Sequence, residues 1–196
     1  MDFEQAARES GVVRPEHVAA LLRSLKTRNF GWIVCNPSTD EQRLQGDLMR
    51  EMPIALVDRD GNPRSSTFIV MVINNVCDLE PGRSEFVTLA PIHDFEKFSA
   101  VILDNDRERA KSYLESARAN LIDEFFYIPN CPQLPKGGIV RFDLFSSLSA
   151  VVYETAIAGG RRIASLTQNG FYFLLMKLTY FLARPESLEI IRETQT

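Results

Sequence analysis

The sequence has few of the residues that build metal centres, disulfide frameworks or cysteine–histidine catalytic pairs. It contains 3 cysteines and 2 histidines in 196 residues, and no CxxC motif. Cys35, Cys77 and Cys131 lie far apart, which is typical of reduced thiols and offers no regular spacing of metal ligands. We therefore expect neither a bound metal nor another cofactor.

The sequence also lacks a long apolar segment and an excess of basic residues. Its longest apolar run near the C-terminus, residues 171–182, is interrupted by Lys177 and Thr179 and is too short to span a bilayer. The first 17 residues include acidic side chains and no apolar core of a signal peptide. The formal net charge of −4 argues against a generally basic surface but allows a local basic patch. These features predict a cytoplasmic protein without a membrane partner.

The remaining composition, 45% hydrophobic and 24% charged, is that of an ordinary globular domain. Apolar residues at helical spacing predict three helices, at residues 15–28, about 104–123 and about 169–183. Extended segments are expected at residues 31–35, 46–58, 67–73, 86–90, 125–129 and 137–144. Strands and helices that are segregated, without βαβ alternation, predict an α+β fold.

The sequence predicts one β-hairpin in detail, over residues 67–90. Residues 67–73 are the most apolar and β-branched part of the chain, which favours a central strand that ends in Cys77-Asp78. Residues 86–90 are its expected partner across a turn at residues 80–83. Pro91 is expected to end the pairing, because proline has no N–H to give to the ladder.

This order of elements resembles the PemK/MazF-like family, the SH3-like barrels of bacterial toxin–antitoxin systems. Gly46-Asp47 resembles the start of the family's first barrel strand, and TFIVMVINN and VTLAPIHDF resemble the second and third strands. The resemblance implies a small, strongly bent antiparallel SH3-like β-barrel over residues 46–196, with an inserted helix and a C-terminal helix. Residues 1–45 would be an N-terminal helical extension.

The resemblance also implies a function. Toxins of this family cleave single-stranded RNA with an arginine in or just after the first hairpin loop and a Thr or Ser near the start of the third strand. Arg64 lies in the corresponding loop, but Ser65-Ser66-Thr67 replaces the Arg-Pro dipeptide of the family and Phe86 stands at the Thr position. We therefore expect a non-catalytic or catalytically altered interaction subunit of a toxin–antitoxin or phage-defence system, with a neighbour-encoded protein as its partner.

A second hypothesis is a metal-independent, sequence-specific endoribonuclease. Arginine would stabilise the pentacovalent phosphate while a neighbour takes the 2′-OH proton. The catalytic candidates are Arg64, Arg83, Ser84 and Glu85. An RNA- or DNA-binding edge would comprise Arg59, Arg64, Arg83, Arg161 and Arg162, provided that the two hairpin loops lie at one end of the barrel. The neighbouring Asp58 and Asp60 favour the alternative of a solvated polar loop.

A third hypothesis is a thiol enzyme that uses Cys77 with Asp78. Such a nucleophile needs a nearby base or cation. His93 is expected to lie about 20 Å from the turn, at roughly 3.3 Å per residue, and is therefore no partner for the thiol. A buried, inert Cys77 beside an Asp78 that makes an Asx-turn is the structural alternative.

The helix expected at residues 169–183 is apolar almost all round. Its aromatic residues are Phe171, Tyr172, Phe173, Tyr180 and Phe181. Such a helix is buried against the barrel, a partner chain, or both, and its composition favours a homo-oligomer or a complex.

Overall fold

The computed structural model describes residues 4, 7–8, 11–27, 30–35, 42–57, 60–103, 107–131 and 133–183. The α-helices there are α2 (Pro15–Lys26), α3 (Phe95–Leu103), α4 (Arg107–Arg118), α5 (Ala150–Ala158) and α6 (Gln168–Ala183). The strands are β1 (Val34–Cys35), β2 (Leu48–Val57), β3 (Pro63–Val72), β4 (Phe86–Asp94), β5 (Phe125–Ile128), β6 (Gly138–Arg141), β7 (Ser146–Ser149) and β8 (Arg162–Leu166). Short 3₁₀-helices lie at η1 (Phe30–Trp32), η2 (Val76–Leu79) and η3 (Phe142–Leu144).

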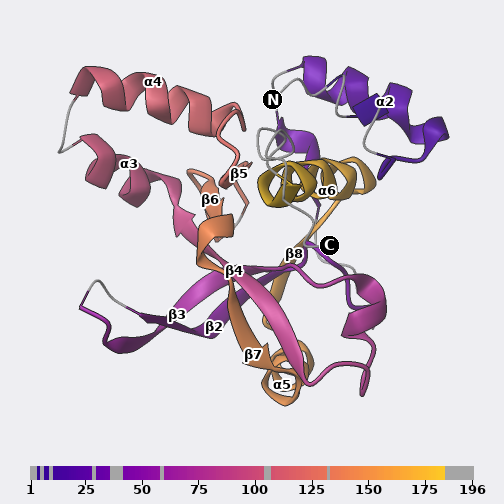
Figure 1. Cartoon of the computed structure of the whole chain (residues 1–196), viewed down its shortest axis with the longest axis vertical. Helices are drawn as coiled ribbons and strands as arrows, with labels where there is room; N and C mark the ends of the chain where they lie inside the picture. The colour runs from indigo at the N-terminus through magenta and orange to yellow at the C-terminus, as the bar shows by residue number, and fades with distance from the viewer. Residues whose placement is uncertain are drawn as a thin grey trace, which may run out of the picture.

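All eight strands belong to one antiparallel sheet in the order β1-β8-β2-β3-β4-β6-β5, and β7 also pairs with β4. Strand β4 changes partner along its length: residues 86–89 pair with β7, and residues 92–94 pair with β6. The sheet therefore curls strongly into a half-barrel (Figure 1). The predicted α+β class and bent antiparallel sheet are confirmed at this level.

The helices cover the sheet in two groups. Figure 1 shows the α3–α4 pair and the α2–α6 pair above the sheet, with α5 at the opposite end beside β7. The α2–α6 group shares one apolar core, to which α2 contributes Leu21 and Leu22 and α6 contributes Phe173. A second core fills the curl of the sheet under α5, and a third lies beneath α3 and α4.

Helix α6 uses most of its apolar surface within the chain. Its buried residues are Gly170, Tyr172, Phe173, Leu174, Met176, Lys177 and Leu178. Gly170 allows a very close approach, because a Cβ atom there would lie 2.2 Å from the carbonyl oxygen of Ile33. The apolar character of this helix is therefore accounted for by its own fold and no longer argues for an oligomer.

Two predicted boundaries in the β3–β4 region are wrong. Strand β3 ends at Val72, and residues 76–79 form η2 instead of continuing the strand to Cys77-Asp78. Asn75 explains the change, since its side-chain oxygen accepts a hydrogen bond from the Cys77 N–H at 3.1 Å and begins η2.

Pro91 does not end strand β4, which continues to Asp94, and it lies opposite Val70 of β3. On the other edge of β4, the pairing with β7 ends at Leu89 and the pairing with β6 begins at Ile92, so Pro91 lies between the two partner strands. The missing N–H of Pro91 therefore costs no ladder hydrogen bond at this position.

The region between β4 and β5 contains the predicted inserted helix and one further helix. Helix α3 starts directly after β4, where the Asp94 carboxylate accepts hydrogen bonds at 3.0 Å from the N–H groups of Glu96 and Lys97. Helix α4 covers residues 107–118, within the range of about 104–123 predicted for the inserted helix, whereas α3 precedes that range and was not predicted. Strands β7 and β8 and helix α5 were not predicted, because their short segments show no clear period.

Candidate functional site

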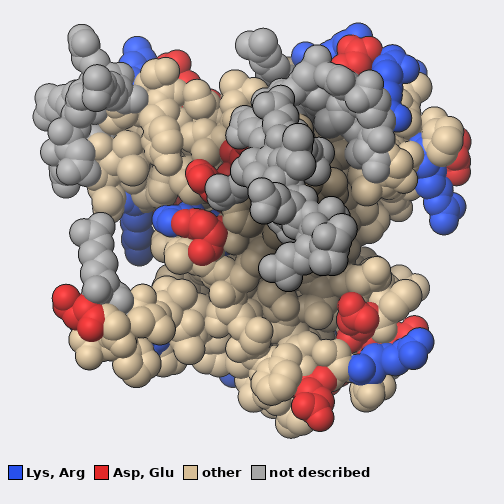
Figure 2. All heavy atoms as spheres, in the orientation of Figure 1, with Lys and Arg blue, Asp and Glu red and all other residues tan. Residues whose placement is uncertain are grey.

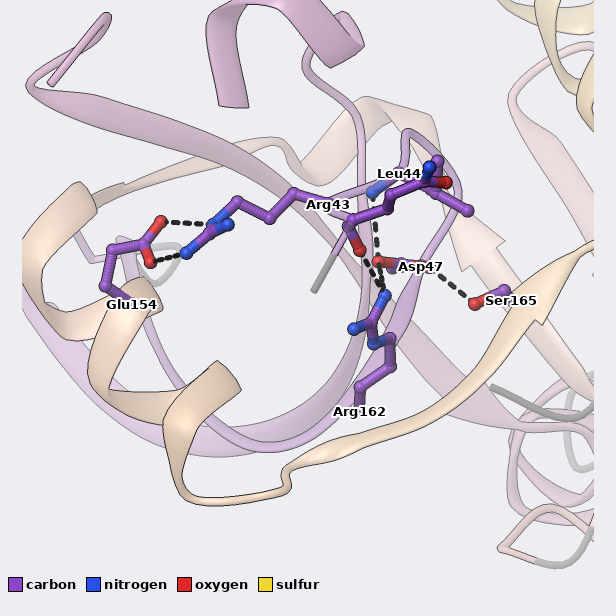
Figure 3. Close-up of polar contacts among 7 residues, drawn as sticks. Arg43, Leu44, Asp47, Glu154, Arg162 and Ser165 are labelled. Carbon is purple, nitrogen blue, oxygen red and sulfur yellow. Dashed lines mark hydrogen bonds and ion pairs between the residues drawn. The ribbon is translucent and has the colours of Figure 1, made fainter. Parts of the chain in front are cut away.

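The residue before β2, Asp47, is a fully buried carboxylate. Its Oδ1 atom accepts a hydrogen bond from the Ser165 hydroxyl at 2.6 Å. Its Oδ2 atom accepts from the Leu44 N–H and from Nη1 of Arg162, both at 3.1 Å (Figure 3). Because Arg162 and Ser165 belong to β8, this carboxylate joins the segment before β2 to a strand more than 100 residues later.

Asp47 and Arg162 form a buried ion pair that joins two parts of the fold. Burial raises the pKa of Asp47, while the Ser165 hydroxyl, the Leu44 N–H and the Arg162 guanidinium act in the opposite direction. The side chain of Arg162 is only 10% exposed, and it also donates to the carbonyl oxygen of Gln42. Arg162, a predicted phosphate ligand, is therefore turned inward.

A second ion pair lies nearer the surface. The Nε and Nη2 atoms of Arg43 donate to the two carboxylate oxygens of Glu154, in a bidentate arrangement that Figure 3 shows. The two side chains are 21% and 32% exposed. This pair connects the segment before β2 with helix α5, and it neutralises both charges within the chain.

Tyr153 of α5 lies beside these charges and is fully buried. Burial raises the pKa of its phenol strongly, and the negative charge of Asp47 acts in the same direction. Its hydroxyl has no hydrogen-bond partner among the described residues. An unpaired buried hydroxyl costs free energy, because the group loses its water without gaining a replacement.

Replacing Tyr153 with phenylalanine is expected to raise the free energy of unfolding by about 1 kcal/mol, because only the unpaired hydroxyl is removed. Urea unfolding would measure the change. Tyr180→Phe is the control, since Tyr180 is half-buried and its hydroxyl is not among the buried, unpaired polar groups of the described residues. A loss of stability in Tyr153→Phe would mean that the hydroxyl has a partner, such as a bound water.

A groove opens next to these two ion pairs. It consists of a cavity of about 350 Å³ and a second of about 230 Å³, which share Leu44 and Val76 as walls. The larger cavity is further lined by Gln42, Arg43, Leu79, Glu80 and Pro81. The smaller is further lined by Gln45, Leu166, Thr167, Gln168 and Phe171. We call these two cavities together the 44–76 groove.

The predicted catalytic residues do not come together within the chain. Arg64 lies near the start of β3, opposite Leu56, whereas Arg83, Ser84 and Glu85 lie in the loop that follows the end of β3. The eight residue steps from Arg64 to Val72 span about 26 Å at roughly 3.3 Å per step. The expectation that both hairpin loops lie at one end is wrong, because successive loops of an antiparallel meander lie at opposite ends of the shared strand.

The residues of the loop before β4 have local partners. Nε of Arg83 lies 3.5 Å from the Glu80 carboxylate, and both side chains are mostly exposed. The Ser84 hydroxyl donates to the carbonyl oxygen of Phe86 at 2.7 Å. The carbonyl oxygen of Glu85 accepts from the N–H of Ala150 at 2.9 Å. The first two contacts lie within the loop, and the third joins the start of β4 to the start of α5.

The other predicted nucleic-acid ligands are dispersed as well. Nη1 of Arg161 donates to the carbonyl oxygen of Glu51 at 2.9 Å, beside the irregularity in β2. Arg59 lies outside the described residues. On the face that Figure 2 shows, Lys and Arg atoms lie intermixed with Asp and Glu atoms, and no continuous basic surface is visible among the described residues.

Cys77 is exposed in η2, which corrects the expectation of a buried thiol. The Asx-type contact is made by Asn75, whose carbonyl oxygen also accepts from the N–H of Asp78 at 3.0 Å. His93 lies opposite Ile139 of β6, far along β4 from η2, and packs its ring on Phe68. His93 is therefore not placed to act as a base for the Cys77 thiol.

Among the described residues, no group of three or more His, Cys, Asp or Glu side chains could hold a metal ion. The same part of the chain has no helix with the length and apolarity needed to cross a bilayer.

The roles of several residues of this site were not predicted from the sequence. Val76 follows two asparagines at the end of an apolar strand, and a single apolar residue at the surface gives no functional signal. Asp47 directly follows Gly46, whose φ of +88° marks a turn into β2. Arg43 and Glu154 gave no signal, because their pairing joins residues 111 positions apart.

Comparisons of the chain with protein-family models, with curated proteins and with solved structures found no match.

Proposed function

We propose that this chain is a non-catalytic interaction subunit whose protein partner binds in the 44–76 groove. One observation supports this proposal most directly: Arg64 and the Arg83–Glu85 loop lie at opposite ends of β3, so one chain offers no composite phosphate site from them. The groove, in contrast, joins apolar walls to polar rims, as surfaces that bind other proteins do.

We further propose that the chain is a divergent PemK/MazF-like protein with an SH3-like barrel. The β2–β3–β4 meander, its curl and the apolar helix at the end of the described chain are compatible with that family. Its role would lie in a bacterial toxin–antitoxin or phage-defence system, and its partner would be a protein encoded by a neighbouring gene.

The test is induced expression in a bacterial host, alone and together with the neighbour-encoded protein. We expect no growth arrest, intact cellular RNA, and co-purification of the two proteins. The competing endoribonuclease hypothesis predicts growth arrest and cleavage of single-stranded RNA, both relieved by Arg64→Ala or Arg83→Ala. Such relief would contradict the proposal, because both arginines are exposed and their replacement is expected to change stability little.

A further inference from the structure

We propose that the outer edge of strand β3 binds an extended segment of another protein chain, which pairs with the backbone of Ser65 and Thr67 and adds a strand to the sheet. This edge lies toward the end of β3 that is remote from Val76 and the 44–76 groove. It is therefore a second surface, and the proposal goes beyond the proposed function.

The backbone of β3 directs alternate residues to its two neighbouring strands. Val72 faces β2, because its N–H donates to the carbonyl oxygen of Asp47 at 2.9 Å and its carbonyl oxygen accepts from the N–H of Gly46 at 2.8 Å. Ile73 faces β4, because its N–H donates to the carbonyl oxygen of Thr88 at 3.0 Å. In an antiparallel ladder this alternation continues along the strand. The even-numbered residues of β3 therefore hydrogen-bond to β2, and the odd-numbered residues point to the opposite edge.

Two features of the outer half of the hairpin agree with this pattern. Pro53 has no N–H and lies opposite Thr67, as expected where β2 and β3 exchange no hydrogen bond. Ala55 lies opposite Ser65, and its carbonyl oxygen accepts from the Ser146 hydroxyl of β7 at 3.4 Å, on the side away from β3. The register irregularity of this pair inserts its extra residue into β2, so the alternation along β3 is unbroken.

The first half of β3 has no strand on its outer edge among the described residues. Strand β4 pairs with β3 only over residues 69–72. Residues 63–67 are exposed, and Figure 1 shows this part of the hairpin projecting from the rest of the sheet. The outward N–H and C=O groups of Ser65 and Thr67 are therefore open to pairing, while Pro63 has no N–H and limits the edge on its far side.

This edge does not carry the usual protection of a strand that has to stay unpaired. Exposed edges are commonly blocked by charged side chains, by a bulge or by a covering element. Residues 65–67 are Ser-Ser-Thr, without charge, and the bulge of the hairpin lies in β2. Such an edge favours an added strand, which satisfies its N–H and C=O groups with a backbone ladder.

The position of β4 argues against a second copy of this chain as the occupant. A two-fold antiparallel pairing that uses all the outward backbone groups must place Ser65 of one copy opposite Thr67 of the other. Pro63 of the second copy would then lie opposite Ile69, where Ile92 of β4 already lies. An extended segment of another protein that bends away beside Thr67 avoids this collision.

Amide hydrogen exchange of the full chain, measured by NMR, tests the pattern directly. In the free chain we expect fast exchange at Ser65 and Thr67, and slow exchange at Ser66 and Phe68, whose N–H groups bond to β2. Slow exchange at Ser65 and Thr67 in the free chain would overturn the inference, because the edge would already be paired.

A phage-displayed library of random 12-residue peptides, selected on the immobilised full chain, supplies the probe. We expect selected peptides that bind the native chain and Thr67→Val within about twofold of each other, and Thr67→Pro about tenfold or more weakly. Proline removes an outward N–H that β2 does not use, whereas valine leaves the backbone unchanged. Thermal unfolding would verify that both variants remain folded.

N-methylation of the selected peptide is a second test, which needs no variant of the chain. A strand added to an edge uses alternate N–H groups, so methyl groups at every second position should abolish binding, and those between them should change it less than about twofold. Equal binding of every selected peptide to Thr67→Pro, uniform loss at all methylated positions, or no selected peptide would each overturn the inference.

Discussion

Replacing Asp47 with alanine is expected to lower the free energy of unfolding by about 3–5 kcal/mol, one of the largest effects of any single substitution in this chain. The variant would leave the buried Arg162 guanidinium without its carboxylate, and would leave the Leu44 N–H and the Ser165 hydroxyl without their acceptor. Urea unfolding, monitored by circular dichroism and by fluorescence, measures the change.

Asp78→Ala is the control for this experiment, because Asp78 is exposed and its loss should change stability by less than about 0.5 kcal/mol. Arg162→Met should be as damaging as Asp47→Ala, since it leaves the buried carboxylate unpaired. The double variant should be less unstable than the two single losses added together, because no unpaired charge remains. A loss below about 1 kcal/mol in Asp47→Ala would mean that the pair is not buried as described.

Lys177 is the second residue for which a large effect is expected. It is fully buried on α6, and its ammonium group donates to the carbonyl oxygens of Asn120 at 2.9 Å and of Ile122 at 2.5 Å. Burial lowers the pKa of Lys177 to about 8, while the negative charges of Asp123 and Glu124 act in the opposite direction. The lysine thereby joins α6 to the turn between α4 and β5.

The free energy of unfolding is therefore expected to rise with pH between about 8 and 10.5, by about 3 kcal/mol for this one group. In this window the unfolded chain still binds the lysine proton and the folded chain has released it, so a higher pH favours folding. Below pH 8 both states are protonated, and the cost of burying the charge is fully present. Urea unfolding at a series of pH values measures the slope.

Lys177→Met should lack this rise, whereas Lys97→Met should retain it, since Lys97 is exposed on α3. The difference between native chain and variant isolates Lys177 from the other groups that titrate at high pH. The same slope in Lys177→Met as in the native chain would show that the ammonium group is hydrated in the folded state.

The candidate site was only partly visible in the sequence. Gly46-Asp47 was identified as the start of the first strand, and Arg161-Arg162 as charged residues of interest. Their interpretation differed from the structure, where Arg162 pairs with Asp47 and Arg161 binds the carbonyl oxygen of Glu51. A one-dimensional pattern cannot tell an arginine directed to solvent from one directed to a buried carboxylate, because both occupy a polar position on a short strand.

Local sequence patterning alone determined the elements with an extended apolar or periodic pattern. These are the strand around residues 67–72, its partner from Phe86, and the final helix. It also determined the α+β class, because strands and helices are segregated along the chain. Tertiary structure alone decided where the loops at the two ends of β3 lie, and that residues 42–47 meet β8 across 115 and 118 positions of sequence. Contacts of that separation depend on the curl of the whole sheet, and the periodicity of a single segment contains no information about them.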